Sequence, residues 1–140
     1  MTYASGRSQP ELFAEMARSL LAEGDVQTTL QKIVDLAVET VDGCDHAGIT
    51  FLLHGGTFAT PAASDAVPAE VDAIQYETGE GPCIDAIREH EVFRTGDLGR
   101  ETRWPSFAAR AQRETGVTSM MGFRLFVAGD TLGALNLFSK

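Results

Sequence analysis

The stretch VTSMMGFRLFVAGDTLGALNLFS, residues 117–139, decides the fold of this chain. Residues 117–127 and 131–139 are its two most strand-like runs, and Ala128, Gly129 and Asp130 stand between them. Alternation with a period of two indicates strands, and a short glycine-containing segment between two such runs indicates an antiparallel hairpin. The end of the chain therefore predicts two adjacent strands of a sheet.

Upstream of this hairpin, three shorter strands are predicted. Residues 47–53 alternate in the same way, and the glycine pair Gly55 and Gly56 leads into a return strand over 57–63. A brief strand follows at 92–95. We therefore expect five or six antiparallel strands, which together with the helices makes an α+β fold.

Helical patterns surround these strands. Apolar residues at three- and four-residue spacing predict helices over about 10–23 and 25–42. Residues 64–90 predict an irregular crossover with two short helices, and Pro105 starts a further helix that Gly116 ends. The first two helices carry more apolar area than one sheet face can cover, so we expect a homodimer formed through residues 10–42.

Length and composition restrict the function classes. The 140 residues suit one domain, and a net charge of −9 argues against direct binding of nucleic acid. The sequence has no apolar run near the ~20 residues of a membrane span and no signal peptide pattern, so we expect a cytoplasmic protein without a membrane partner. Because Lys140 directly follows the last strand, we expect one domain over 1–140 that stops before a closing helix.

A ligand pocket is expected on the sheet face opposite the N-terminal helices. The crossover and the helix after Trp104 are short and interrupted by glycine and proline, so they cover a sheet imperfectly and leave a cavity. Small-molecule sites are mostly apolar with a few polar groups. Residues that supply this mixture, and are therefore the candidate ligand-binding residues, are Phe51, Tyr76, Cys83, Trp104, Phe107, Arg124 and Asn136.

Simpler interpretations stay open for several of these residues. Cys83 can be a buried thiol, Trp104 can fill the edge of the core, and Arg124 and Asn136 can lie on an exposed sheet face. The free amides at the helix that begins with Pro82 would favour an anion. The histidines have no metal-ligand spacing with the cysteines, so the sequence predicts no metal site and names no cofactor.

Three short motifs carry a family resemblance. They are Tyr-Glu-Thr-Gly-Glu-Gly-Pro-Cys at 76–83, Arg-Trp-Pro-Ser-Phe at 103–107 and Leu-Gly-Ala-Leu-Asn-Leu at 132–137. With the order of elements, they resemble a GAF domain, a relative of the PAS fold, and more narrowly the actinobacterial GAF domains that precede an RNA-binding ANTAR domain. The resemblance implies a six-stranded sheet with helices behind it and a ligand pocket opposite. Since this chain carries no ANTAR segment, we expect no direct RNA binding by it.

The leading functional interpretation is a non-enzymatic sensory or regulatory module. By resemblance, it binds a small molecule and relays a signal through a dimer to an output domain, with transcription antitermination as one output. One alternative is the free methionine-(R)-sulfoxide reductase activity found in the GAF family, for which Cys83 and Cys44 would supply the thiols. The other alternative is a dimerisation domain without a working pocket.

Overall fold

The central feature of the computed structural model is a five-stranded antiparallel sheet with the strand order β2-β1-β5-β4-β3. The structure describes residues 25–53, 56–89, 92–127 and 130–140, so the helix predicted over 10–23 lies outside the described residues. The α+β class and the strand number are confirmed. In chain order the elements are α2 (Asp25–Thr40), β1 (His46–Leu52), β2 (Phe58–Ala63), α3 (Ala66–Thr78), α4 (Pro82–Glu89), β3 (Phe93–Thr95), a short 3-10 helix (Leu98–Arg100), α5 (Pro105–Thr115), β4 (Ser119–Val127) and β5 (Asp130–Ser139).

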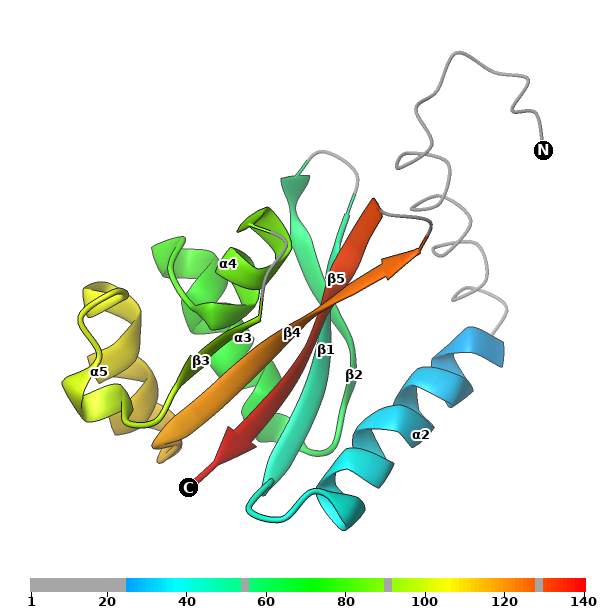
Figure 1. Ribbon diagram of the computed structural model, residues 1–140, viewed down its shortest axis with the longest axis horizontal. Coiled ribbons are helices and arrows are strands. Elements are labelled where there is room, and N and C mark those ends of the chain that lie inside the picture. The colour runs from blue at the N-terminus through cyan, green and yellow to red at the C-terminus, as the bar shows by residue number, and fades with distance from the viewer. Residues whose placement is uncertain (1–24, 54–55, 90–91, 128–129) are drawn as a thin grey trace.

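Helices cover the two faces of the sheet unequally (Figure 1). One face carries α2, and the other carries α3, α4 and α5, here named the crossover face. Each face has its own hydrophobic core: Leu30 and Val34 of α2 pack with β1, whereas Cys83, Phe107 and Phe138 belong to the core of the crossover face. The predicted arrangement, with an N-terminal helix on one face and the crossover on the other, matches the structure.

Strand β1 separates the two cores because its residues alternate between the faces. Ala47, Ile49 and Phe51 pack in the core beside α2, so Gly48 and Thr50 point to the crossover face. In register, Gly48 lies opposite Asn136 of β5. The middle of this strand, at Gly48 and Thr50, is therefore small and polar on the crossover side, whereas Leu52 at its end packs against the apolar core.

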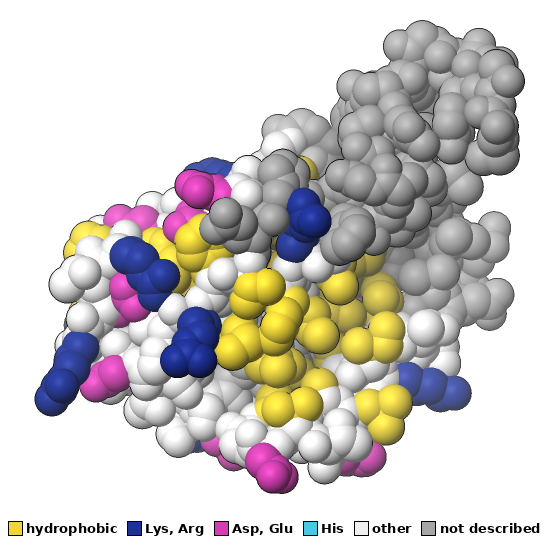
Figure 2. Space-filling view, in the orientation of Figure 1, with side chains coloured by type: hydrophobic (Ala, Val, Ile, Leu, Met, Phe, Trp, Pro, Cys, Tyr) yellow, Lys and Arg dark blue, Asp and Glu magenta, His cyan; other side chains and the backbone are white. Residues whose placement is uncertain are grey.

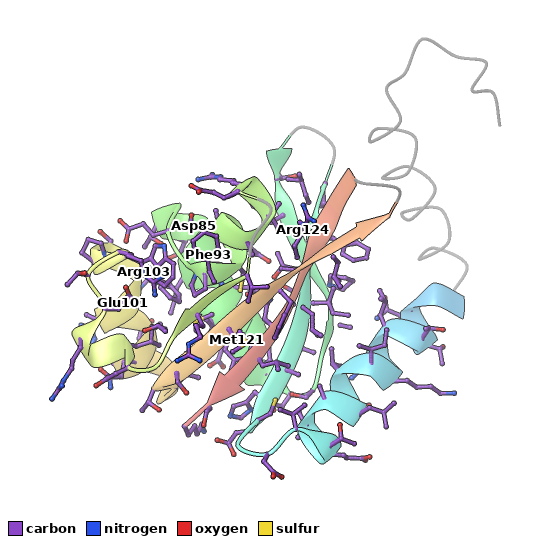
Figure 3. The ribbon with its side chains drawn as sticks, in the orientation of Figure 1. Asp85, Phe93, Glu101, Arg103, Met121 and Arg124 are labelled. Carbon is purple, nitrogen blue, oxygen red and sulfur yellow. The ribbon has the colours of Figure 1, made fainter. Side chains whose placement is uncertain are left out.

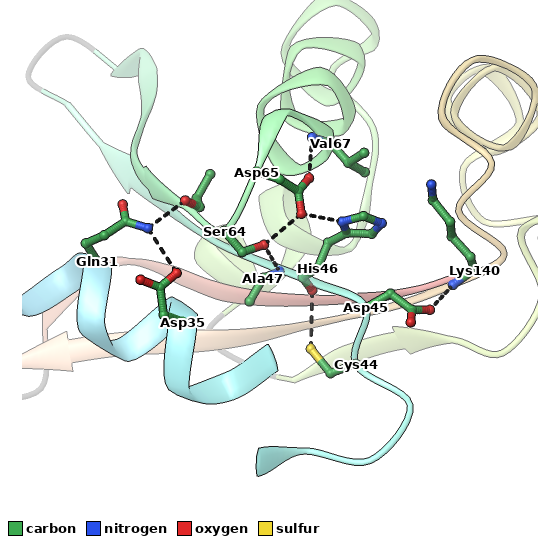
Figure 4. Close-up of polar contacts among 11 residues, drawn as sticks. Gln31, Asp35, Cys44, Asp45, His46, Ala47, Ser64, Asp65, Val67 and Lys140 are labelled. Atoms are coloured by element: carbon green, nitrogen blue, oxygen red, sulfur yellow. Dashed lines mark hydrogen bonds and ion pairs between the residues drawn. The ribbon is translucent and has the colours of Figure 1, made fainter. Parts of the chain in front are cut away.

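Helix α3 runs from Ala66 to Thr78 and is longer than the short helix that the sequence predicted in this part of the crossover. The Asp65 side chain accepts a hydrogen bond from the Val67 backbone N–H at 2.8 Å and so caps the helix. The same carboxylate lies 2.5 Å from Nδ1 of His46, and Ser64 donates to it at 3.1 Å (Figure 4). At the other end, Gly79 adopts a φ of 69°, which ends the helix in a left-handed cap.

Helix α2 has one buried side and one exposed side. Leu30 and Val34 are buried against the sheet, while Ile33 and Leu36 on the helix are 41% and 54% exposed, and Val41, which follows the end of the helix, is 44% exposed. Among the described residues, no helix has both the length and the apolar character that crossing a bilayer requires. The exposed apolar side chains of α2 thus remain available for a contact outside this core.

Candidate functional site

Two of the resemblance motifs contact each other where the loop before α4 meets the start of α5. Glu80 Oε1 accepts hydrogen bonds from the backbone N–H groups of Ser106 and Phe107, at 2.8 and 3.2 Å, and so caps the start of α5. The Trp104 indole N–H donates to Asp85 at 2.7 Å, and the indole is 2% exposed. We name Glu80, Asp85, Glu101, Arg103 and Trp104 the motif brace.

The outer part of the motif brace is an ion pair laid over the indole. Arg103 donates to both carboxylate oxygens of Glu101, at 2.8 and 3.0 Å, and its guanidinium carbon lies 4.3 Å from the Trp104 ring centre. Hydrogen bonds from Arg103 lower the pKa of Glu101 to about 2. Figure 3 shows Asp85, Glu101 and Arg103 gathered near α5, with Phe93 beside them. Every charged group of this brace therefore has a partner, which is the arrangement of a structural contact.

A different polar group lies beneath α3, on the crossover face. The Asp72 side chain is fully buried, and its Oδ2 accepts from the hydroxyls of Thr50, Thr60 and Tyr76 at 2.8, 2.7 and 3.1 Å. Its Oδ1 accepts from Nε2 of Gln75 at 3.2 Å. None of these donors carries a charge. Together with Asn136, these residues form what we name the Asp72 cluster.

Burial dominates the acid–base properties of this cluster. It raises the pKa of Asp72 above its ordinary value, although the four donors act in the opposite direction. Burial and the neighbouring Asp72 carboxyl likewise raise the pKa of Tyr76. A carboxyl that is fully buried without a cationic partner is uncommon in a core that serves packing alone.

Asn136 links this cluster to the centre of the sheet. Its Nδ2 donates to Thr50 at 2.7 Å, while its Oδ1 is buried and has no hydrogen-bond partner among the described residues. Its neighbours across the strands are Gly48 and Gly122. A Cβ at Gly48 would lie 2.7 Å from Pro68 of α3, and one at Gly122 would lie 3.0 Å from the Pro82 carbonyl oxygen. Helices α3 and α4 therefore pack directly against the sheet on either side of this amide.

The structure brings six of the seven candidate residues to the crossover face. Tyr76 and Asn136 belong to the Asp72 cluster, and Cys83, Trp104 and Phe107 belong to the core of this face. Arg124 shares the face because it lies opposite Ala134, a member of the same core. These side chains are closely packed: Cys83, Phe107 and Asn136 are fully buried, so they do not line an open cavity in this structure.

Phe51 is the exception, and its predicted place is corrected. It packs in the core beside α2 with Ile49, on the opposite side of the sheet. Residues 47, 49 and 51 share one face of β1, and α2 supplies the apolar surface that buries them. Thr50 is therefore the β1 residue that reaches the candidate site.

The two cysteines lie on opposite faces of the sheet. Cys83 belongs to the core of the crossover face and Cys44 to the core beside α2. Burial raises the pKa of both thiols, that of Cys83 strongly. Both are free thiols. Their placement separates them by the thickness of the sheet.

The start of α4 is occupied by a side chain of the protein itself. The Cys83 backbone N–H donates to Oε1 of Gln75 at 3.0 Å, so the anion site expected at Pro82 is not favoured. Within the described ranges, no group of three histidine, cysteine or acidic residues could hold a metal ion.

An open groove lies on the other side of the sheet, between the end of α2 and strand β3. It has a volume of about 310 Å³, and its lining includes Val41, Cys44, Arg94, Met121 and Leu137. Figure 2 shows hydrophobic side chains gathered over the sheet on the face seen there, and Met121 lies on this face in Figure 3. Its open shape and its mixed lining, which also includes Asp42, Thr95, Ser119 and Ser139, suit a protein contact better than an enclosed small-molecule site.

Sequence reasoning missed Thr50, Thr60, Asp72 and Gln75. A usable signal was present in α3, where Asp72, Gln75 and Tyr76 are spaced three and four residues apart and so share one side of the helix. That side includes the buried positions Pro68 and Val71. A polar stripe on the buried side of a helix indicates an internal hydrogen-bond network.

Comparisons with known proteins agree with this fold. The chain resembles the GAF domain region of a putative membrane protein from Geobacter sulfurreducens PCA, with a TM-score of 0.64, 19% identity, and coverage of 89% of this chain and 79% of that chain. It also resembles a type II free methionine-R-sulfoxide reductase from Thermoplasma acidophilum, with a TM-score of 0.62, 17% identity, and coverage of 90% and 76%. A third similar structure is the NreA protein of Staphylococcus aureus, mutated in its nitrate binding site, with a TM-score of 0.57, 13% identity, and coverage of 87% and 88%.

At these identities the structural matches show the fold alone. No curated protein sequence matches the chain. The model of the GAF domain family matches residues 23–140, which is most of the sequence, and this chain therefore belongs to the GAF domain family.

Proposed function

We propose that this chain is a non-enzymatic sensory module that binds a small molecule at the Asp72 cluster. The observation that carries the proposal is a fully buried carboxyl with uncharged donors, next to a buried amide oxygen that has no partner among the described residues. Such groups reduce stability unless a further partner satisfies them, and they concentrate at functional sites. GAF domains serve sensory and regulatory roles, and this site lies on the face where the resemblance implies a pocket.

The site is closed in this structure, so binding requires a movement of its cover. Two hydrogen-bond partners of Asp72, Thr60 and Tyr76, are half-buried, and the rings of Tyr76 and Phe58 stack with centres 5.5 Å apart. A ligand entering there would displace α3, which sits on Gly48 through Pro68. It would shift the population of the two helix positions only by the difference in its affinity for them.

The α2 side provides the surface for the relay, in our proposal as a homodimer. The side chains of Ile33, Leu36 and Val41 are exposed, and the open groove, which Val41 also lines, continues this surface over the sheet. The dimer would transmit the helix movement to an output domain elsewhere in the protein, with an ANTAR domain and transcription antitermination as the output that the motifs favour.

The reductase alternative conflicts with the positions of the thiols. A resolving cysteine must reach the sulfur of the nucleophile, but Cys44 and Cys83 lie on opposite faces of the sheet. Burial also raises the pKa of Cys83, which disfavours the reactive thiolate. The similarity to the Thermoplasma acidophilum reductase therefore extends, in our proposal, to the fold and not to the chemistry.

Ligand capture tests the sensory proposal. The purified protein is incubated with a metabolite extract and examined by native mass spectrometry, and a bound small molecule is expected in wild type but not in Asp72→Asn. Turnover of free methionine sulfoxide with a thiol reductant would contradict the non-enzymatic part. Failure of every extract fraction to bind or to raise the melting temperature would contradict the sensory part.

Oligomeric state tests the relay. Ile33→Glu combined with Leu36→Glu places charges on the exposed side of α2 and is expected to give a folded monomer by light scattering. Val34→Glu is the matched control, since Val34 is fully buried and its replacement is expected to unfold the domain instead. A monomeric wild type would contradict the dimer.

A further inference from the structure

Two oxygen atoms of the Asp72 cluster can accept further hydrogen bonds. A carboxylate offers about two acceptor positions on each oxygen. Three hydroxyls already donate to Oδ2 of Asp72, but only Gln75 donates to Oδ1. Oδ1 of Asn136 has no donor at all among the described residues. A complementary ligand must therefore bring donors.

The direction of the Asn136 amide follows from the same network. The Thr50 hydroxyl has one proton and donates it to Asp72 at 2.8 Å. Thr50 must therefore accept from Asn136, which places the amide nitrogen against Thr50 at 2.7 Å and leaves the amide oxygen facing away. The free group of Asn136 is thus an acceptor.

The charge of Asp72 also favours a ligand that brings N–H donors. None of the ion pairs in the described part of the chain includes Asp72, and its four donors are three hydroxyls and one amide. A negative charge buried without a cation is unfavourable, and the cost falls when a positive charge enters. An anionic head group would instead meet the Asp72 carboxylate and the unpaired Oδ1 of Asn136.

We propose that the Asp72 cluster recognises the ammonium group of a small organic cation, with Asp72 and Asn136 as its acceptors. This inference rests on the proposed function, because it names the ligand class of the same site. The cation enters at the half-buried edge of Thr60 and Tyr76 and donates to Oδ1 of Asp72 and to Oδ1 of Asn136. An ammonium group has three N–H donors, which is enough for both oxygens.

A set of three probes of nearly equal size tests the proposal. Propylammonium, propionamide and propionate are titrated separately into ¹⁵N-labelled protein at constant ionic strength, and amide shifts are followed by NMR. We expect saturable shifts of the Asn136 side-chain amide and of residues 72–76 with propylammonium, and at least tenfold weaker binding of propionate.

Two variants separate the site from general electrostatic attraction. Asp72→Asn keeps the shape and removes the charge, and it is expected to weaken propylammonium binding at least tenfold. Glu70→Gln removes a charge from the exposed side of the same helix and is expected to change the affinity less than twofold. If Asp72→Asn does not fold, the order of the three probes on wild type decides alone.

The outcomes distinguish the ligand class from the proposed function. Preferential binding of propionate at residues 72–76 would overturn the cation class while supporting the site. Propylammonium shifts confined to surface acids, equal loss in Glu70→Gln, or no response to any probe would overturn the class as well. The sensory role itself fails only if the metabolite extract also yields no ligand.

Discussion

The motif brace and the Asp72 cluster lie on the same face of the sheet, but they differ in how their charged and polar groups are paired. In the brace, Glu101 is paired with Arg103, and the Asp85 carboxylate accepts from the Trp104 indole. In the cluster, Asp72 is buried among uncharged donors and Asn136 keeps a free acceptor. The brace therefore holds two recognisable motifs together, whereas the cluster is built on Asp72, which lies outside the motifs, and on Tyr76 and Asn136, which lie within two of them.

Removal of the indole at the centre of the brace has the largest expected effect. Trp104→Ala empties a site that is 2% exposed and leaves Asp85 without its donor, so the free energy of unfolding should fall by about 3–5 kcal/mol. Urea denaturation measures this change. Trp104→Phe retains most of the volume and is expected to lose less. A loss below about 1 kcal/mol in Trp104→Ala would show that the motif has no structural role.

The pH dependence of stability should separate the two regions by sign. Burial raises the pKa of Asp72, so the folded state holds its proton longer than the unfolded chain does. The contribution of Asp72 to the free energy of unfolding is therefore fully present below pH 3.8, the ordinary pKa of an aspartate. It is lost as the pH rises through the pKa of the folded state. Wild type should therefore lose stability relative to Asp72→Asn from pH 4 upward, by at most about 1.4 kcal/mol per pH unit. Parallel urea midpoints of the two proteins at every pH would contradict this.

Glu101 should show the opposite slope and a smaller effect. Its pKa is lowered from 4.5 to about 2, so its contribution is present above pH 4.5 and disappears as the pH falls toward 2. In Glu101→Gln, the loss of unfolding free energy that Glu101 causes below pH 4.5 should be absent. The dependence of stability on pH above 5 should stay unchanged. The expected effect is modest because the Arg103 side chain is 48% exposed and solvent screens the pair. A slope of the same sign as that of Asp72 would abolish the distinction between the two regions.

Most of the fold could be predicted from the sequence, because periodicity and turn residues determine it locally. The hairpin at 117–139, the helix after Pro105 and its end at Gly116 all follow from local patterns. The site could not be predicted in the same way. Thr50 reaches Asp72 only because β1 turns Phe51 toward α2, and this orientation depends on which face that helix covers. The alternation of residues within a single strand does not show which face of that strand a helix covers.

The ligand-induced change in melting temperature tests the central claim most directly. The best compound from a library of small metabolites is measured on wild type, Asp72→Asn and Glu101→Gln under one buffer condition. If the ligand site is the Asp72 cluster and the motif brace is structural, the shift in melting temperature will be lost in Asp72→Asn and retained in Glu101→Gln. An undiminished shift in Asp72→Asn, or a shift lost only in Glu101→Gln, would contradict this assignment.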